Sequence, residues 1–300
     1  MRLNRENIKM YSGSKKFAII GRGFIYNQHA EAISEIGGEI TDIIDESQGI
    51  DAWKEMVKKT KADCIVILAP NYLHFEMAKF SAENGKMVLC EKPLALKSED
   101  AKTLAKYPNV FTVYQLRYHP LVKKLKLEIK DKEKYEIEMD VSVHRDEEYW
   151  QSWKGLQDKS GGILFNLGIH YFDLLLYLFG KPNEILTESV TDKTVKGGIS
   201  GKNYLCKWRI SAEAPKDVQC RLFKINGVNY DFSSQTEFPS METKVKKRIK
   251  SSSPENLHSH VYKDLLEGKG IVPQEALKSI ELIEKIVDEA KASSLSSFAQ

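Results

Sequence analysis

The first 119 residues alternate short apolar runs with stretches of helical periodicity, and this alternation restricts the fold more than any other feature. Predicted strands occupy residues 16–21, 39–45, 62–70, 87–91 and 110–116, and predicted helices occupy 26–37, 52–59, 73–84 and a stretch that Ser98 caps. Continuously apolar strands separated by helices are typical of β-α-β units, because the helices cover both faces of a parallel sheet. We therefore predict an α/β chain that begins with a doubly wound parallel sheet over residues 1–119, after a polar leader, residues 1–15.

The pattern changes near residue 120, where alternating apolar and polar residues replace the continuous apolar runs. The predicted strands here are 135–144, 184–191, 203–210, 219–226 and 228–232, and the predicted helices are 121–129, 166–179 and 273–292, with an irregular aromatic segment at 149–160. The Asn226-Gly227 pair between the last two strands suits a tight hairpin. We expect residues 120–300 to form an α+β domain with a large open, mainly antiparallel sheet.

Charge and hydropathy exclude several classes of protein. The chain has 300 residues and a formal net charge of +3, too little for a nucleic-acid footprint, and the basic run 244–250 is interpreted as a solvated strand or loop. The apolar stretch 163–179 contains Asn166, His170 and Asp173, which argues against a membrane span. The N-terminus lacks the apolar region of a secretory signal. We predict a cytoplasmic protein that contacts neither nucleic acid nor membrane.

Cysteine and histidine positions give no sign of a metal or disulfide site. The four cysteines are scattered and form no C-x-x-C pair, as expected of small core residues in a reducing compartment. The His258-Ser259-His260 segment has no further ligands beside it in the sequence. We interpret it as a loop from which His258 reaches the substrate pocket, and we predict no metal.

A glycine turn after the first predicted strand indicates a dinucleotide site. Gly21 and Gly23 allow a tight turn and a close approach of the backbone to a pyrophosphate at the helix N-terminus, although Tyr26 replaces the third glycine of G-x-G-x-x-G. Asp45 ends the second strand about twenty residues later, where a carboxylate binds the adenosine ribose. Such a carboxylate would repel a 2′-phosphate, so the sequence predicts NAD as the cofactor of a Rossmann domain.

Two sets of polar residues are candidates for chemistry. Lys92 follows Glu91 at the carboxyl end of a predicted parallel strand, where a partly desolvated lysine would have a lowered pKa. In a helix, Asn166, His170 and Asp173 would share one face amid apolar sequence, and burying three polar groups together costs stability unless they are satisfied. We expect these two sets to form one catalytic site.

The segments GRGFIYNQHAEAI, APNYLH, CEKPLAL, QLRYHP and GGILFNLGIHYFDLLLYLFG together resemble the Gfo/Idh/MocA oxidoreductases. The resemblance implies hydride transfer between a sugar carbon and NAD(P), and homo-oligomers built through the C-terminal sheet, with a tetramer favoured over a dimer. It implies Lys92 and His170 as the proton-handling pair. The implied cofactor-binding residues are Gly21, Gly23, Phe24, Ile25, Asp45, Ala69, Pro70, Asn71, His74, Glu91, Lys92 and Gln115.

A narrower resemblance rests on PNYLH, QLRYH, YWQSWKG and the asparagine of NLGIH. These segments are similar to the WlbA/WbpB type, UDP-sugar 3-dehydrogenases of bacterial surface-polysaccharide assembly. That similarity implies oxidation of the 3-hydroxyl of UDP-N-acetylglucosaminuronate. NAD then either exchanges freely or stays bound and is recycled by a second substrate such as 2-oxoglutarate. Tyr26 and several short loops depart from the pattern.

Substrate contacts are expected from residues around this site. His170 would accept the hydroxyl proton while Lys92 stabilises the oxygen, and Asn166 would orient one of the two. Arg117 and Lys154 are candidates for binding anionic groups of the substrate. The full set of predicted substrate-binding residues is Arg117, Tyr149, Trp153, Lys154, Asn166, His170, Asp173 and His258.

The same residues are also compatible with other functions. Within the same scaffold the alternatives are a UDP-N-acetylglucosamine 3-dehydrogenase, an inositol or free-sugar dehydrogenase, and an NAD-dependent glycosidase. A sugar-sensing regulator without catalysis is the alternative of a different class. The presence of both Lys92 and His170 favours an enzyme, because a regulator has no need of a proton-handling pair.

Overall fold

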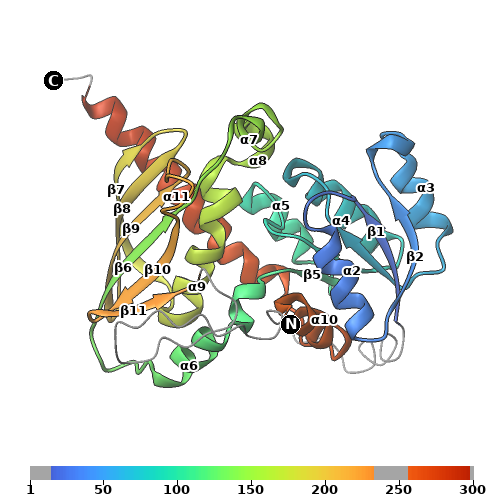
Figure 1. Cartoon of the computed structure of the whole chain (residues 1–300), viewed down its shortest axis with the longest axis horizontal. Coiled ribbons are helices and arrows are strands. Elements are labelled where there is room, and N and C mark those ends of the chain that lie inside the picture. Colours follow the sequence, from blue (N-terminus) through green and yellow to red (C-terminus); the bar gives the residue numbers. More distant parts are fainter. Residues whose placement is uncertain (1–14, 233–255, 298–300) are drawn as a thin grey trace.

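A computed structural model describes residues 15–232 and 256–297 of the chain. It contains two sheets side by side, with helix α11 (Pro273–Ser297) running between them (Figure 1). The polar leader up to residue 14 and the basic run 244–250 lie outside the described residues, so their predicted structures stay predictions.

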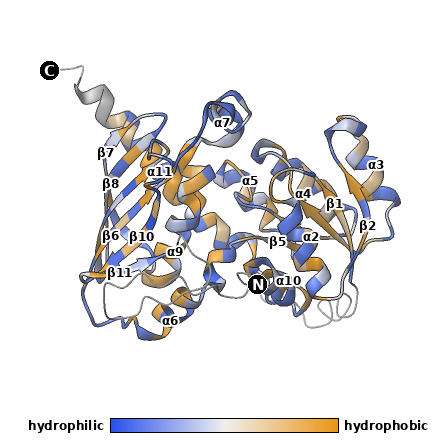
Figure 2. Cartoon of the chain, in the orientation of Figure 1, coloured by the Kyte–Doolittle hydropathy of each residue, from blue (hydrophilic) through white to orange (hydrophobic). Residues whose placement is uncertain are grey.

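The N-terminal sheet has five parallel strands in the order β2-β1-β3-β4-β5. The strands are β1 (Lys16–Ile20), β2 (Glu39–Ile44), β3 (Cys64–Ile67), β4 (Met87–Cys90) and β5 (Val110–Thr112), and the helices are α2 (Tyr26–Glu35), α3 (Ala52–Lys59), α4 (His74–Glu83) and α5 (Ser98–Leu104). The predicted doubly wound sheet is confirmed. Strands β3 and β4 are fully buried, because helices pack on both faces. Figure 2 shows hydrophobic colouring along the strands of this sheet, between its helices.

Helix α5 begins one residue earlier than the predicted cap at Ser98 implies. Ser98 is the first helical residue, Lys97 occupies the N-cap position, and no side chain caps the helix there. The backbone N–H of Ser98 instead donates to Glu284 of α11 at 2.7 Å. A side chain from a distant helix therefore satisfies the donor that a local cap was expected to satisfy.

The C-terminal sheet has six strands in the order β11-β10-β6-β9-β8-β7. They are β6 (Tyr135–Ser142), β7 (Pro182–Val190), β8 (Thr194–Gly201), β9 (Tyr204–Ser211), β10 (Cys220–Ile225) and β11 (Val228–Asp231). All neighbours are antiparallel except β6 and β9. The predicted open, mainly antiparallel sheet and its Asn226-Gly227 hairpin are confirmed, both turn residues having positive φ (48° and 83°).

Strand β8 was missed because its sequence, TVKGGISG, has the composition of a loop. The structure explains the glycine at position 197: a Cβ there would lie 2.1 Å from the Leu186 carbonyl oxygen and 2.9 Å from the Trp208 ring. Neighbouring strands approach too closely for a side chain, so glycine marks a central strand here.

The helices of the C-terminal half are α6 (Pro120–Glu128), α7 (Glu147–Gln151), α8 (Gln157–Ser160), α9 (Ile169–Phe179), α10 (Leu257–Leu266) and α11, and a π-helical turn, Leu164–Gly168, precedes α9. The aromatic segment predicted as irregular thus contains two short helices. Segment 157–179 is long and apolar enough to cross a membrane, but 72% of its most apolar window is buried inside the protein, as in a core helix.

Helix α10 returns from the C-terminal half to the N-terminal sheet. The sequence placed His258–His260 in a loop, which is wrong: both residues belong to this helix. Its Val261, Tyr262 and Leu265 are buried against the strands, with the Tyr262 ring 5.4 Å from that of Phe17. This return brings His258 to the carboxyl end of β4, a contact on which the site below depends.

Candidate active site

The turn between β1 and α2 has the shape that a pyrophosphate requires. Gly21 has a φ of 103°, and a Cβ there would lie 2.7 Å from the carbonyl carbon and oxygen of Leu68. No side chain would fit between this turn and the end of β3. At Gly23 a Cβ would have open space, so the turn leaves its outer side clear.

The N-terminus of α2 has no side-chain cap, because Ile25 occupies the N-cap position. The Tyr26 N–H donates to the Gly23 carbonyl at 3.1 Å, but the next two N–H groups have no partner in the described part of the chain and are available to an anion. Phe24 is 85% exposed beside them. Tyr26, which replaces the third glycine, is half-buried, and the guanidinium of Arg22 lies 5.6 Å from its ring centre. The tyrosine also packs against the apolar cluster between α2 and the sheet, so this contact accommodates a large side chain where the motif has glycine.

Asp45 caps the turn that follows β2. Its Oδ1 accepts from the backbone N–H of Ser47 at 2.9 Å and from the Ser47 hydroxyl at 2.6 Å, and these bonds lower the pKa of the carboxyl. Asp45 thus has a structural role at this turn in addition to the predicted ribose contact. Oδ2 takes no part in the cap, and the carboxylate stays charged at the position expected for a ribose ligand.

His74 connects the loops that follow β3 and β4. Its Nδ1 lies 2.6 Å from the carbonyl oxygen of Pro93, and its Nε2 lies 2.7 Å from that of Ala69. The side chain is buried, and burial lowers its pKa. The sequence placed His74 among the cofactor ligands, but both ring nitrogens already face protein carbonyls. Its place in the structure is that of a brace that holds Ala69 and Pro93 in position.

Asn166 joins four segments of the site. Its backbone carbonyl accepts from the Lys92 ammonium at 2.8 Å, its Oδ1 accepts from Asn71 Nδ2 at 3.0 Å, and its Nδ2 donates to the carbonyl of Lys154 at 3.1 Å. The π-helical turn that contains Asn166 leaves this carbonyl free of the regular ladder. Asn166 therefore orients Lys92 through its backbone, whereas the sequence assigned that role to its side chain.

Lys92 and His170 have the electrostatic character of a proton-handling pair. Burial lowers the pKa of the Lys92 ammonium, and Arg145 and Lys154 lower it further, against the opposing charge of Glu91. Burial and then the charge of Lys92 hold the pKa of His170 well below its ordinary value. His170 is thus a neutral imidazole, and its Nδ1 is buried without a partner among the residues described.

Two further cations lie near this pair. Arg145, which sequence reasoning missed, lies with its guanidinium 5.0 Å from the ring centre of Tyr149, and the Lys154 ammonium lies 5.8 Å from the ring centre of Phe24. Within residues 15–232 and 256–297, neither cation has an ion-pair partner. Arg145 follows the end of β6, and a basic residue at a strand end was the only signal available.

Arg117 and Asp173, both predicted to bind substrate, form an ion pair with each other. The guanidinium of Arg117 donates to both oxygens of Asp173, at 2.7 and 2.8 Å, and also pairs with Glu275 of α11. Asp173 is 2% exposed, and burial raises its pKa. Because the two charges balance each other inside the protein, this pair fastens α9 to the segment after β5, and its predicted contact with substrate stays a prediction.

The remaining predicted residues fall into three places. Tyr149 and Trp153 are half-buried in the α7–α8 segment. The amide oxygen of Gln115 is buried without a partner among the described residues. Glu91 is buried between His29 and His258, whose hydrogen bonds outweigh the effect of burial and hold its pKa well below the usual range. Glu91 therefore faces two histidines, one of which, His29, sequence reasoning missed.

Two family models match this chain. The NAD-binding Rossmann fold of the GFO/IDH/MocA oxidoreductase family matches residues 15–109, and its C-terminal alpha/beta domain matches residues 129–205. The 2,7-anhydro-N-acetylneuraminate hydratase of Escherichia coli is 28% identical over 57% of this chain and 51% of its own length. Glucose-6-phosphate 3-dehydrogenase of Bacillus subtilis is 28% identical over 60% and 57%. The chain spans about half the length of these curated relatives.

Solved structures align over a longer part of the chain. The WlbA (WbpB) dehydrogenase from Thermus thermophilus, solved with NAD and UDP-GlcNAcA, is 25% identical with a TM-score of 0.75, covering 90% of this chain and 93% of that one. The WlbA dehydrogenase from Chromobacterium violaceum is 22% identical with a TM-score of 0.78, over 93% and 94%, and shares the fold. Because both family models match in order and together cover more than half of its residues, the chain belongs to the Gfo/Idh/MocA oxidoreductase family.

Proposed function

We propose that the protein oxidises the 3-hydroxyl of a UDP-N-acetyl sugar with NAD, and that UDP-N-acetylglucosaminuronate is the favoured substrate. The observation that carries the proposal is a neutral His170 beside Lys92, with the unpaired cations Arg145 and Lys154 nearby. This arrangement suits removal of a proton from an anionic substrate. The similarity to the Thermus thermophilus dehydrogenase solved with NAD and UDP-GlcNAcA supports the choice of sugar.

The residues of the first turn fit the cofactor. A Cβ at Gly21 would fill the space between the turn and Leu68, and the uncapped N-terminus of α2 offers N–H groups to the pyrophosphate. Asp45 would bind the adenosine ribose through Oδ2, since Oδ1 caps its own turn. When bound, NAD⁺ supplies the hydride acceptor.

The proton of the 3-hydroxyl would pass to His170 as the hydride leaves the same carbon, so that the carbinol loses both hydrogens and becomes a ketone. His170 suits this role because it is uncharged. Lys92 would donate to the same oxygen and stabilise its developing negative charge, held in position by the Asn166 carbonyl.

Arg145 and Lys154 would bind the uronate carboxylate or the diphosphate. The positive charges of both residues lower the pKa of Lys92, so both lie near the reacting centre. A guanidinium matches a carboxylate with two parallel hydrogen bonds, which makes Arg145 the stronger candidate for the uronate. Tyr149, beneath the guanidinium, would hold it in place.

The substrate assignment is tested by product analysis. We expect UDP-N-acetylglucosaminuronate and NAD to give NADH absorbance and a product lacking two hydrogen atoms, with turnover in the presence of 2-oxoglutarate if NAD stays bound. Arg145→Ala should raise KM about tenfold or more for the uronate and much less for UDP-N-acetylglucosamine. Lys106→Ala, which removes an exposed cation after α5, is the control. Oxidation of the neutral sugar alone would contradict the uronate assignment.

The pH profile tests the state of His170. Since its pKa is held well below 6.5, the base form persists at neutral pH, and kcat/KM should stay level on acidification until the pH falls below about 6.5. Burial is the main cause of this lowering, the charge of Lys92 adds to it, and the charge of Glu91 opposes it. Lys92→Met removes one of these causes, so the residual activity should decline at a higher pH than in the wild type. An acidic limb centred above pH 7 in the wild type would contradict this assignment.

A second candidate function is oxidation of a phosphorylated free sugar. The Bacillus subtilis relative is named a glucose-6-phosphate 3-dehydrogenase, and the same unpaired cations suit a phosphate. Glucose 6-phosphate in the assay above distinguishes the two substrates. In either case we propose a cytoplasmic enzyme rather than a sugar-sensing regulator.

We also propose that the outer face of the C-terminal sheet forms a homo-oligomer interface. The strand register places Leu186, Leu205 and the Arg209–Asp140 ion pair on one face. Leu186 and Leu205 are more than half exposed there, at 58% and 53%. Apolar side chains beside paired charges are typical of a surface that packs against a second copy.

A further inference from the structure

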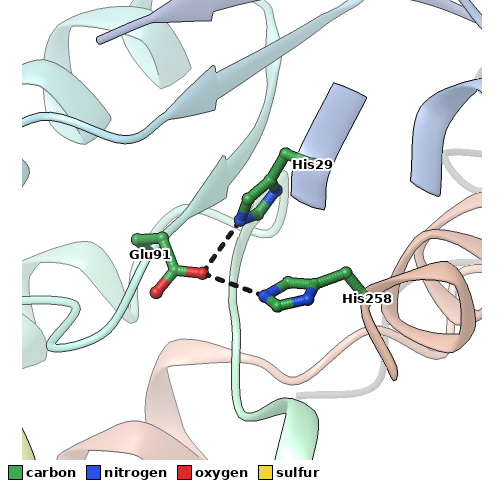
Figure 3. A group of neighbouring side chains, drawn as sticks. All are labelled: His29, Glu91 and His258. Atoms are coloured by element: carbon green, nitrogen blue, oxygen red, sulfur yellow. Dashed lines mark hydrogen bonds and ion pairs between the residues drawn. The ribbon is translucent and has the colours of Figure 1, made fainter. Parts of the chain in front are cut away.

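Three side chains from distant parts of the chain converge behind Lys92. His29 comes from α2, Glu91 follows β4, and His258 begins α10 (Figure 3). Their exposed fractions are 0%, 7% and 4%. Burying a carboxylate costs free energy unless its charge is balanced, so this cluster requires an explanation.

The three side chains point their ligand atoms at one another. Glu91 Oε1 lies 3.0 Å from His29 Nε2 and 3.6 Å from His258 Nε2, and all three atoms lie within 4.8 Å of one another. Figure 3 shows both rings directed at the same carboxylate oxygen.

The outward-facing atoms of the cluster are held by other groups. Tyr262 OH lies 2.8 Å from His29 Nδ1, Asn256 Oδ1 lies 3.2 Å from His258 Nδ1, and the backbone N–H of Lys92 donates to Glu91 Oε2 at 3.1 Å. Each ligand is thus oriented by a hydrogen bond from outside the cluster. This is the pattern by which proteins fix metal-binding histidines and carboxylates.

The hydrogen bonds of Asn256 fix the orientation of the His258 ring and direct its Nε2 into the cluster. Asn256 Oδ1 accepts from the His258 backbone N–H, and Asn256 Nδ2 donates to the Gln28 carbonyl, so the amide orientation is settled. Nδ1 of His258 must therefore carry the proton. Nε2 of His258 faces Glu91 Oε1 at 3.6 Å, slightly beyond hydrogen-bond distance, and makes no hydrogen bond within the described residues.

We infer that His29, Glu91 and His258 bind a divalent transition-metal ion of the Zn²⁺ class through Nε2, Oε1 and Nε2. The three ligand atoms converge on one point in a buried site, and a divalent cation there would balance the Glu91 charge and bind both rings. Zinc bonds of about 2.0–2.2 Å in tetrahedral geometry separate neighbouring ligand atoms by about 3.3 Å. The two measured separations, 3.0 and 3.6 Å, lie on either side of that value.

The ion would fasten α10 to α2 and β4. It would not touch the reacting atoms, and the inference does not depend on which sugar the enzyme oxidises. The sequence could not suggest it, because His29, Glu91 and His258 are far apart in the chain and only folding brings them together.

The test is metal binding by the chelator-treated full chain. We expect one equivalent of Co²⁺ to bind with the visible absorption of a low-symmetry, four-coordinate site, Zn²⁺ to displace it, and Zn²⁺ to raise the melting temperature. His29→Gln and His258→Gln should each weaken Zn²⁺ binding by at least tenfold, and Tyr262→Phe should weaken it about tenfold through loss of the outer hydrogen bond. Each variant is checked for a cooperative thermal transition.

His260→Gln is the matched control. It lies two residues further along α10, where its ring stacks on Tyr118 at 5.8 Å, and it should bind Zn²⁺ as the wild type does. A wild type that binds neither Co²⁺ nor Zn²⁺ would overturn the inference in favour of a protonated His258. Unchanged affinity in both His29→Gln and His258→Gln would equally overturn it. Because the readout is metal binding, failure of the substrate assay leaves this test intact.

Discussion

Replacing Lys92 by methionine is expected to lower kcat by about two orders of magnitude or more, while NAD still binds. The methionine keeps the length of the side chain but removes the ammonium that Asn166 holds and that would stabilise the substrate oxygen. His170→Ala should have an effect of similar size, because it removes the group that accepts the proton. Steady-state kinetics give kcat, and titration with NADH measures cofactor binding.

Lys86→Met is the matched control for this prediction. Lys86 precedes the same strand, β4, at its opposite end, and its ammonium donates to the carbonyls of Thr60 and Ala62. Its loss should reduce stability and leave kcat near the wild-type value. Near-normal turnover in both Lys92→Met and His170→Ala would refute the assignment of the proton-handling pair.

Asp173→Asn is expected to lower the free energy of unfolding by about 3 kcal/mol. The substitution leaves the Arg117 charge buried, with Glu275 as its remaining acidic partner, and the two side chains of the original pair are only 11% and 3% exposed. Breaking a buried pair costs more than the pair contributes, because one charge stays desolvated. Denaturant-induced unfolding at equilibrium measures the difference.

The Asp140–Arg209 pair provides the comparison. Like the buried pair, it has an N–O separation of 2.7 Å and joins two separate elements, here β6 and β9. Its side chains, however, are 36% and 51% exposed. Asp140→Asn should therefore cost no more than about 1 kcal/mol. Equal losses in the two variants would mean that Asp173 and Arg117 are not desolvated in the folded protein, and would favour their predicted contact with substrate.

Sequence patterns predicted the elements whose signal is local. The apolar runs at residues 64–67 and 87–90 became buried central strands, because a parallel sheet covered on both faces leaves no polar position in them. Gly21 was predicted to allow a tight turn that approaches a pyrophosphate, and the structure adds a second need for glycine, since a Cβ there would lie 2.7 Å from Leu68. The fold class and the family could therefore be predicted, because they depend on short segments whose structure is set by residues nearby in the sequence.

Elements that depend on distant neighbours were missed or misread. Strand β8 is rich in glycine because β7 and Trp208 leave no room for side chains, a reason that its own sequence does not contain. His258 was placed in a loop, since only contact with the N-terminal sheet stabilises α10. The π-helical turn at Asn166 altered the helix face on which the sequence had aligned Asn166, His170 and Asp173.

By itself, the sequence determined that this chain forms a doubly wound sheet followed by an open sheet, with a dinucleotide turn at Gly21 and candidate chemistry at Lys92 and His170. The tertiary structure alone decided which charges remain available. It pairs Arg117 with Asp173, leaves Arg145 and Lys154 unpaired among the residues described, and directs Glu91 at two histidines. The physical reason is that the free energy of a buried charge depends on the partner within a few ångströms, and folding brings that partner from any part of the chain.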